Sequence, residues 1–156
     1  MRIIKRTPPR VSQIFADYNP PLYFLTMNTW QRAKCLNNLG ILEALRLYAE
    51  KNIPQGRAIG RFVVMPDHIH LFARLSTDSK LSDFVRILKQ SLSAVLKGQG
   101  LESPWWQPGF FDHILRHDES YSEKWDYVRQ NPVRAGLVKT PDEWPYQGEI
   151  ARIDRV

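Results

Sequence analysis

Two histidines separated by one residue, His68 and His70, lie in the apolar stretch MPDHIHLF (65–72). Side chains alternate between the two faces of an extended strand. Both imidazoles would therefore project from one face, while Ile69 and Leu71 would project from the other. Two imidazoles directed at one point suit a divalent metal ion. The pattern makes His68 and His70 candidate metal ligands.

A second pair of polar side chains, Tyr127 and Asn131, is spaced four residues apart in a segment that we expect to be helical. Residues at this spacing share one face of a helix. A phenol and an amide oxygen set opposite the histidines would place a nucleophile beside a metal site. The residues alone leave two simpler roles open: Tyr127 as a half-buried core tyrosine, and Asn131 as a turn residue before Pro132.

Hydrophobic periodicity and breaker residues predict the elements that must position these side chains. The order is β-α-β-β-α-β-α. Its first six elements match a ferredoxin-like arrangement, so we predict an α+β fold with helices packed on an antiparallel sheet. The expected elements are a strand in 21–30, a helix over about 36–52, two strands in 57–75 joined near Met65–Asp67, a helix in 79–100, an aromatic strand in 105–116 and a helix over 120–131.

The last of these elements is the C-terminal helix that carries Tyr127. Ser120 and Glu123 fit a capping box at its start, and Pro132 disfavours helical geometry in Asn131, so the helix should end there. We expect one domain over 1–156, with a basic N-terminal arm over 1–20 and a tail over 148–156.

Charge and cysteine content restrict the function classes. Lys and Arg number 22 against 16 acidic residues, a formal charge of +6, which favours a polyanionic partner such as nucleic acid. The single cysteine, Cys35, cannot form an internal disulfide, so a reducing cytoplasm is the expected compartment. No apolar stretch reaches the length that spans a membrane, and we expect no membrane partner.

Several strings read together resemble the HUH single-tyrosine transposases, and most closely the REP-associated tyrosine transposases. They are VVMPDHIHLF, WWQPGFFDHILRHDESYSEKWDYVRQNPVRAGLV, EWPYQ and, near the start, YFLTMNTWQRAKCL. The resemblance extends from about residue 21 to 147. A His-x-His motif by itself is unspecific. Followed about sixty residues later by Tyr-x-x-x-Asn-Pro-Val-Arg-x-Gly, it is specific.

The resemblance implies that His68 and His70 hold Mg²⁺ or Mn²⁺, with Asn131 as the third ligand where many relatives carry glutamine. It implies that Tyr127 attacks DNA and forms a covalent 5′-phosphotyrosine. A free phenol has a pKa of about 10, so the metal, Arg129 or a bound water would have to stabilise the phenolate. The implied substrate is single-stranded DNA near hairpin-forming palindromic repeats, and the implied location is the nucleoid. Relatives act as monomers or as homodimers, and both remain open.

Further residues are candidates for contacts at this site, although each also has an ordinary structural role. Asp67 and His113 could orient a histidine ligand, or serve as a turn residue and a buried histidine. Trp105 and Trp106 could stack on bases or pack in the core. Candidates for phosphate contacts are Arg32, Lys89, Arg116, Arg129 and Arg134, any of which could also be a solvated charge.

Two other functions compete with that of a DNA-cutting enzyme. The first is a domesticated relative that binds hairpin nucleic acid without cleaving it. The second is a metal enzyme of small molecules. A cupin-like site would need a glutamate shortly after His70, and a two-histidine phosphoesterase would need a second His-x-Ser/Thr motif; the sequence has neither.

Overall fold

The structure is a computed structural model that describes residues 8, 20–116 and 118–154, except for the side chains of 118 and 119. The expected basic arm over 1–20 lies outside these described residues, apart from Pro8 and Pro20. Within the described ranges, no helix is both long and apolar enough to cross a membrane.

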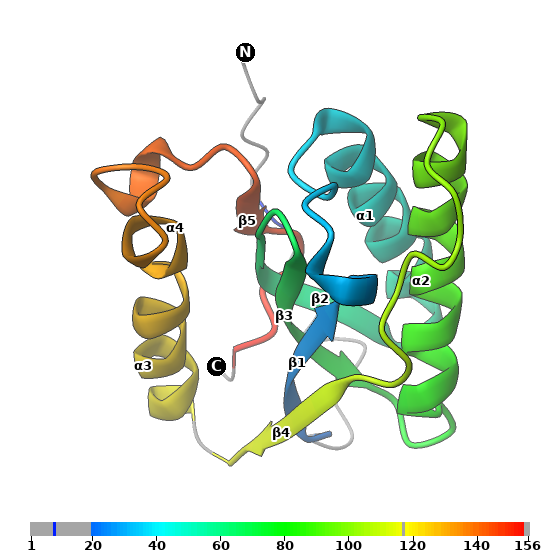
Figure 1. Cartoon of the computed structure of the whole chain (residues 1–156). Helices are drawn as coiled ribbons and strands as arrows, with labels where there is room; N and C mark the ends of the chain where they lie inside the picture. Colours follow the sequence, from blue (N-terminus) through cyan, green and yellow to red (C-terminus); the bar gives the residue numbers. More distant parts are fainter. Residues whose placement is uncertain (1–7, 9–19, 117, 155–156) are drawn as a thin grey trace.

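Five antiparallel strands form one sheet in the order β4-β1-β3-β2-β5 (Figure 1). The first four strands have the arrangement of a ferredoxin-like sheet, which confirms the predicted α+β class. The expected turn at Met65–Asp67 is also confirmed, because it joins β2 to β3. The strands are β1 (Leu22–Asn28), β2 (Arg57–Val64), β3 (His68–Leu75), β4 (Phe111–Leu115) and β5 (Gln147–Glu149).

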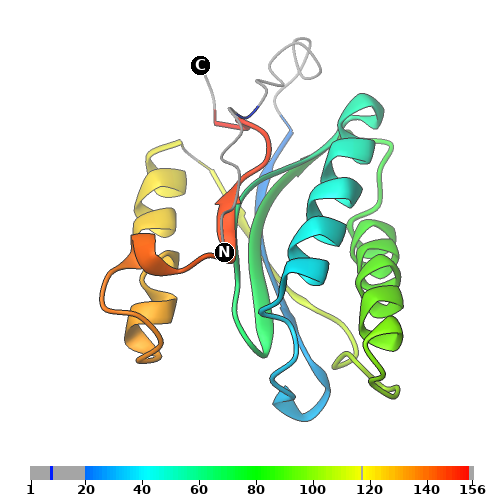
Figure 2. The same ribbon diagram turned by 90° about the horizontal axis from the view of Figure 1, so that it is seen from above.

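Helices α1 (Leu39–Asn52) and α2 (Leu81–Gly98) cover one face of the sheet (Figure 2). Asn38 begins α1, because its side-chain oxygen accepts a hydrogen bond from the backbone N–H of Ile41 at 3.0 Å. The apolar residues of α2 recur every three or four positions and form one buried stripe, as the sequence predicts. Its buried members are Phe84, Val85, Leu88, Leu92 and Leu96.

Helix α3 (Asp118–Val128) covers the opposite face of the sheet (Figure 2). Tyr121, Trp125 and Val128 pack there against residues of the sheet. The Tyr121 ring stacks on Phe72 of β3 at 4.7 Å between centroids, and its hydroxyl accepts a hydrogen bond from the backbone N–H of Arg61. These contacts hold the tyrosine-bearing helix over the sheet of its own chain.

The tyrosine helix differs from its predicted bounds at both ends. It begins at Asp118, so Ser120 lies inside the helix and the predicted capping box is wrong. It ends at Val128, because Pro132 has no N–H to donate to the Val128 carbonyl four residues earlier. Asn131 opens a separate short helix, α4 (Asn131–Arg134), in which Pro132 takes the second position.

The segment after α4 contains a strand that we did not expect. After the short 3-10 helix η3 (Pro141–Glu143), β5 pairs with Arg61–Val63 of β2. Ala151 and Ile153 follow β5 and are buried with the residues that pack under α3. Part of the segment assigned as a tail therefore belongs to the sheet and its core.

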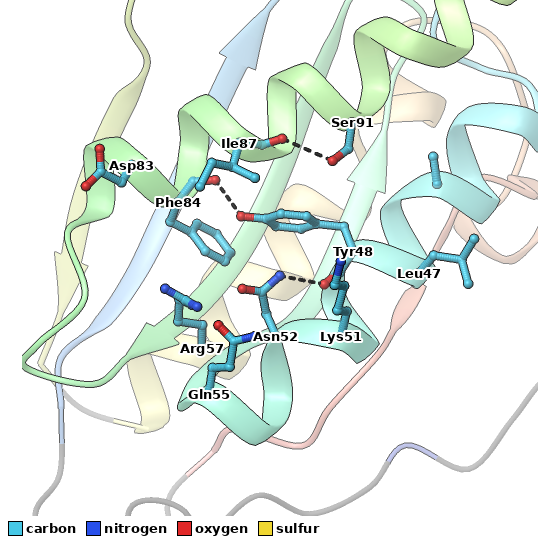
Figure 3. A pocket seen from close by; sticks show the side chains of 11 residues that line it. Leu47, Tyr48, Lys51, Asn52, Gln55, Arg57, Asp83, Phe84, Ile87 and Ser91 are labelled. Atoms are coloured by element: carbon cyan, nitrogen blue, oxygen red, sulfur yellow. Dashed lines mark hydrogen bonds between the residues drawn. The ribbon is translucent and has the colours of Figure 1, made fainter.

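A pocket of about 440 Å³ opens between α1 and α2 (Figure 3). In its wall, the Tyr48 hydroxyl donates to the Phe84 carbonyl at 2.7 Å, and the Asn52 amide donates to the Tyr48 carbonyl at 2.8 Å. None of the residues predicted to carry chemistry lines this pocket. It lies on the face of the sheet opposite α3, and so opposite the histidine pair.

Candidate active site

Strand β3 presents the two histidines on the face covered by α3. Ile69 and Leu71 are fully buried under α1 and α2, whereas His68 and His70 are partly exposed on the other face. The two imidazole rings meet edge to face, with centroids 4.7 Å apart. The alternation expected of a strand thus brings both rings to one place.

Hydrogen bonds orient both imidazoles through the same ring atom, Nδ1. The Thr26 hydroxyl lies 2.8 Å from Nδ1 of His70, and the Asp67 carboxylate lies 2.7 Å from Nδ1 of His68. An ionised carboxylate only accepts, so Nδ1 of His68 carries the hydrogen. With Nδ1 protonated, Nε2 keeps the lone pair that a metal ligand needs. No hydrogen bond among the described residues occupies Nε2 of either ring.

The surroundings keep both histidines uncharged near neutral pH. Burial, the largest cause, and the charges of His68, Lys124, Arg134 and Arg32 together lower the pKa of His70 to about 3. Burial also lowers the pKa of His68, although its hydrogen bond to the Asp67 carboxylate opposes this change. Neutral imidazoles are the form that binds metal.

Backbone contacts fix the turn before the histidines. The N–H of Thr29 donates to the Asp67 carbonyl at 3.0 Å, and those of Cys35 and Leu36 donate to the Pro66 carbonyl. Arg32 then reaches Asp67, with Nε 3.0 Å from the carboxylate. Its φ of 57° is in the left-handed region that a non-glycine residue rarely adopts. The Arg32–Asp67–His68 chain therefore rests on a tightly held loop.

Tyr127 projects from α3 on the side away from the buried Val128, and its side chain is 62% exposed. The guanidinium carbon of Arg134 lies 4.1 Å from the centre of its ring, and Nζ of Lys124 lies 5.8 Å from it. The phenol is therefore accessible to a large substrate and has two cations close to its ring. Positive charges at these positions favour a developing phenolate or a bound phosphate.

Asn131 does not share a continuous helix with Tyr127, but Arg134 connects the two residues. One guanidinium nitrogen of Arg134 donates to the Tyr127 carbonyl at 2.8 Å and to Oδ1 of Asn131 at 2.6 Å. The amide oxygen predicted as a metal ligand is thus already a hydrogen-bond acceptor. It retains a second lone pair.

Lys124 links the tyrosine to the histidines, and the sequence analysis missed it. Its Nζ lies 4.8 Å from the centre of the Phe24 ring, and that ring stacks on His70 at 5.2 Å with an interplanar angle of 21°. A single lysine three residues before a tyrosine looks like a solvated charge in the sequence. Only the spacing to Tyr127, which places both on neighbouring helical positions, could have indicated it.

The remaining predicted residues lie in different places. Lys89 of α2 is on the far side of the sheet, where it donates to the carbonyls of Gln107 and Gly109. Arg129, just after α3, donates to the Asp142 carboxylate at 3.3 Å. Arg116 is exposed beyond the end of β4. His113 of β4 is exposed beside Phe24, and no contact joins it to His68 or His70 in the described part of the chain.

The two tryptophans predicted either to stack on bases or to pack do the latter. Both are partly buried against the core under α1 and α2. Nε1 of Trp106 donates to the Ser93 hydroxyl at 2.9 Å, and Nε1 of Trp105 donates to the Leu101 carbonyl at 3.2 Å. On the face of the histidines, the sheet itself presents the exposed ring of Phe111, which is 63% exposed and pairs with Thr26.

Donor chemistry at the site fits a divalent ion only in part. The two oriented, neutral imidazoles are suitable ligands. No group of three His, Cys, Asp or Glu side chains that could hold a metal occurs among the residues that the structure describes. A third protein ligand would therefore have to be an amide, a backbone carbonyl or a hydroxyl.

Comparison with known proteins finds relatives among the REP-associated tyrosine transposases. A REP-associated tyrosine transposase of Escherichia coli K12 is 34% identical over 89 residues, which span 56% of this chain and 52% of that protein. A Haemophilus influenzae protein described as a "Putative REP-associated tyrosine transposase" is 28% identical over 136 residues, or 80% of this chain and 77% of that protein.

A solved structure of a REP-associated tyrosine transposase bound to a REP hairpin matches the fold with a TM-score of 0.67 and 25% identity. The match covers 100% of this chain and 92% of that one. The sequence model of the family described as "Transposase IS200 like" matches residues 22–131, which include both histidines, Tyr127 and Asn131. The chain therefore belongs to the IS200-like transposase family and resembles its REP-associated tyrosine transposases.

Proposed function

We propose that the protein is a metal-dependent single-stranded DNA endonuclease and strand transferase in which Tyr127 is the nucleophile. The observation that carries this proposal is the continuous set of contacts from Tyr127 through Lys124 and Phe24 to His70. An exposed phenol and two oriented imidazoles thus share one face of the sheet within a single chain. Family membership supports the same reading.

In this proposal His68 and His70 hold Mg²⁺ or Mn²⁺ through Nε2. Asn131 would contribute its amide oxygen, either through the lone pair that Arg134 leaves free or after Arg134 moves away. A divalent ion supplies Lewis acidity that polarises the scissile phosphate. Thr26 and Asp67 keep the imidazoles in the ligating tautomer, and Arg32 positions Asp67.

The Tyr127 oxygen attacks the phosphorus, and a new Tyr–O–P bond replaces the bond between phosphorus and the 3′ oxygen. The phenolic proton is lost and the leaving 3′ oxygen gains one, so the products are a 5′-phosphotyrosine and a free 3′-hydroxyl. Because the link is still a phosphodiester, a 3′-hydroxyl can later attack it and rejoin the strands without ATP. The flanking charges of Lys124 and Arg134 favour the attacking phenolate.

We infer that the substrate is a hairpin with a single-stranded flank. The related solved structure holds a REP hairpin, and the charges around this site are mainly positive. A recessed phosphate of intact duplex would reach Tyr127 less easily than a flexible single strand. Hairpin shape and a few unpaired bases would then supply specificity.

A cleavage assay tests this function. End-labelled single-stranded hairpins from the palindromic repeats flanking the gene are incubated with Mn²⁺ or Mg²⁺ and resolved on a denaturing gel. We expect a cut that needs metal and leaves the 3′-end-labelled fragment covalently attached to the protein, and that Tyr127→Phe and His70→Ala abolish. Tyr23→Phe, which removes a hydroxyl from the opposite face of β1, should cut normally.

The alternative is a protein that binds hairpin nucleic acid without cutting it. The hydrogen bond from Arg134 to the Asn131 oxygen favours this second candidate, since it leaves that oxygen only one lone pair to complete a metal site with the two histidines. Tight binding of the repeats by wild type, with no cut in either metal and no loss of affinity in Tyr127→Phe, would support the binder and contradict the endonuclease.

A further inference from the structure

Lys124 occupies a central place between the nucleophile and the histidine pair. From α3 its side chain extends over the sheet, where Nζ lies 4.8 Å from the Phe24 ring centre and 5.8 Å from that of Tyr127. The side chain is partly buried, and its charge contributes to the lowered pKa of His70. Contacts with the Phe24 and Tyr127 rings therefore hold the ammonium near both the proposed nucleophile and the histidine pair.

The ammonium of Lys124 also differs from the other cations of the site because, among the described residues, no oxygen accepts a hydrogen bond from it and no carboxylate pairs with it. Arg32 pairs with Asp67, Arg129 pairs with Asp142, and Arg134 donates to two oxygens of its own chain. No ion pair or hydrogen bond engages Nζ of Lys124 in the described ranges, so its three donors face only rings and solvent. A partly desolvated charge without a counter-ion is a strong site for an anion.

We propose that Lys124 binds the phosphate that Tyr127 attacks. This inference rests on the proposed endonuclease function and assigns a further substrate-contacting residue to it. A compact ammonium suits a single non-bridging phosphate oxygen. Because Lys124 and Tyr127 are three residues apart on one helix, they keep a fixed relation to each other when the helix shifts. Lys124 thus places the phosphorus within reach of the phenol.

The same contact strengthens as the reaction proceeds. Negative charge increases on the non-bridging oxygens and on the attacking and leaving oxygens, and an ammonium already in place needs no reorganisation to stabilise it. Arg134 also lies close to the Tyr127 ring but is held by the Tyr127 and Asn131 oxygens. Lys124 is accordingly the cation that is free to bind substrate, and Arg134 is a positioning residue.

The first test is single-turnover cleavage by Lys124→Met and Lys124→Arg. Methionine keeps an unbranched apolar side chain on Phe24 and removes the charge, so we expect cleavage to slow about a hundredfold or more. Arginine keeps the positive charge, so the Lys124→Arg protein should retain most of the wild-type cleavage rate. Lys97→Met, which removes an exposed charge from the far side of the molecule on α2, should cleave at the wild-type rate.

The second test locates the phosphate that Lys124 contacts and does not need cleavage. In the Tyr127→Phe background, each phosphate of the hairpin flank is replaced in turn by an uncharged methylphosphonate, and DNA affinity is measured with and without Lys124→Met. At one position we expect the methylphosphonate to weaken DNA binding about tenfold when Lys124 is present. In the Lys124→Met protein the same replacement should leave the affinity unchanged. That position should be the bond that wild type cuts.

The outcomes separate this inference from the proposed function. If wild type cuts no DNA, the endonuclease proposal fails, whatever the binding experiment shows. If wild type cuts but no methylphosphonate position couples to Lys124, or the coupled position lies away from the cut, the assignment of Lys124 is overturned. A Lys124→Met protein that cuts at the wild-type rate overturns it as well.

Discussion

One hydrogen bond from a neighbouring element orients the imidazole ring of each of the two histidines. His70 points its Nδ1 at Thr26 of β1, and His68 points the same atom at Asp67 of the preceding turn. Each ring is thereby fixed in orientation, and the Asp67 carboxylate also fixes the tautomer of His68. Metal-ligating histidines commonly have such a partner, and its loss typically weakens metal binding 10- to 100-fold. The effect of one hydroxyl on metal affinity is therefore measurable.

Replacing Thr26 with valine should weaken Mn²⁺ binding about tenfold. Valine has a similar shape and removes only the oxygen that holds Nδ1 of His70. Affinity would be measured by electron paramagnetic resonance of free Mn²⁺. Thr26→Ser keeps a hydroxyl and should bind nearly as wild type does. Equal affinity in the valine and wild-type proteins would show that Thr26 does not orient a metal ligand.

His70 should also make the metal-free fold sensitive to acid. Its ordinary pKa of about 6.5 is lowered to about 3 in the folded chain, mainly by burial. Between these values the unfolded chain takes up a proton that the folded chain does not, so falling pH favours unfolding by up to about 1.4 kcal/mol per pH unit. Urea unfolding from pH 7 to pH 4 measures this slope. His70→Gln should reduce the dependence of the unfolding free energy on pH. If the unfolding free energies of the wild-type and His70→Gln proteins change equally with pH, the prediction is contradicted.

At the scale of elements, the docking of α3 depends on one close approach to β2. A Cβ added to Gly60 would lie 2.6 Å from the Tyr121 hydroxyl and 2.8 Å from Ile153. The strand pairing shifts register between Ile59 and Phe62, around this glycine. Gly60 thus marks a place where the strand bends to admit the tyrosine helix and the C-terminal segment.

Gly60→Ala should therefore destabilise the protein by about 1–3 kcal/mol, the range for overpacking a filled core. Denaturant unfolding would measure the change. Gly98→Ala is the matched control, because a Cβ there meets nothing within 4 Å and lies at the end of α2. That variant should keep or slightly raise the stability. Equal loss in the two variants would mean that Gly60 is not the point of close contact.

The sequence predicted the elements whose periodicity or breakers are strong, such as α2 with its apolar stripe and the Pro66 turn. It did not predict β5, because Gln147–Glu149 has no apolar alternation and becomes a strand only by pairing with β2. It placed the two histidines on one face but missed Thr26, Phe24 and Lys124. Those three residues meet His70 only through the register of β1 on β3 and the docking of α3, which are long-range properties.

At the scale of the whole molecule, the sheet separates two environments. One face carries the histidines, Tyr127 and the cations Lys124, Arg134 and Arg32. The other carries α1 and α2 (Figure 2), and with them the pocket between these helices and the side chains of Trp105 and Trp106. Lys89 lies on this second side and holds the loop before β4, so its charge is remote from the tyrosine. Among the described residues, Lys89 is thus not part of the same surface as Lys124, Arg134 and Arg32.

Tyr121, Trp125 and Val128 dock α3 on the sheet that carries His68 and His70 of the same chain, so we expect Tyr127 and the histidines of one chain to act together. Mixing Tyr127→Phe protein with His70→Ala protein should therefore not restore cleavage of labelled hairpins. An exchange of α3 between two copies would instead recreate complete sites in mixed dimers, and cleavage would recover to a fraction of the wild-type level. Co-expressing the two variants before purification allows such dimers to form. Recovered cleavage would contradict a site built within one chain, and its absence, with wild type active in the same assay, would support it.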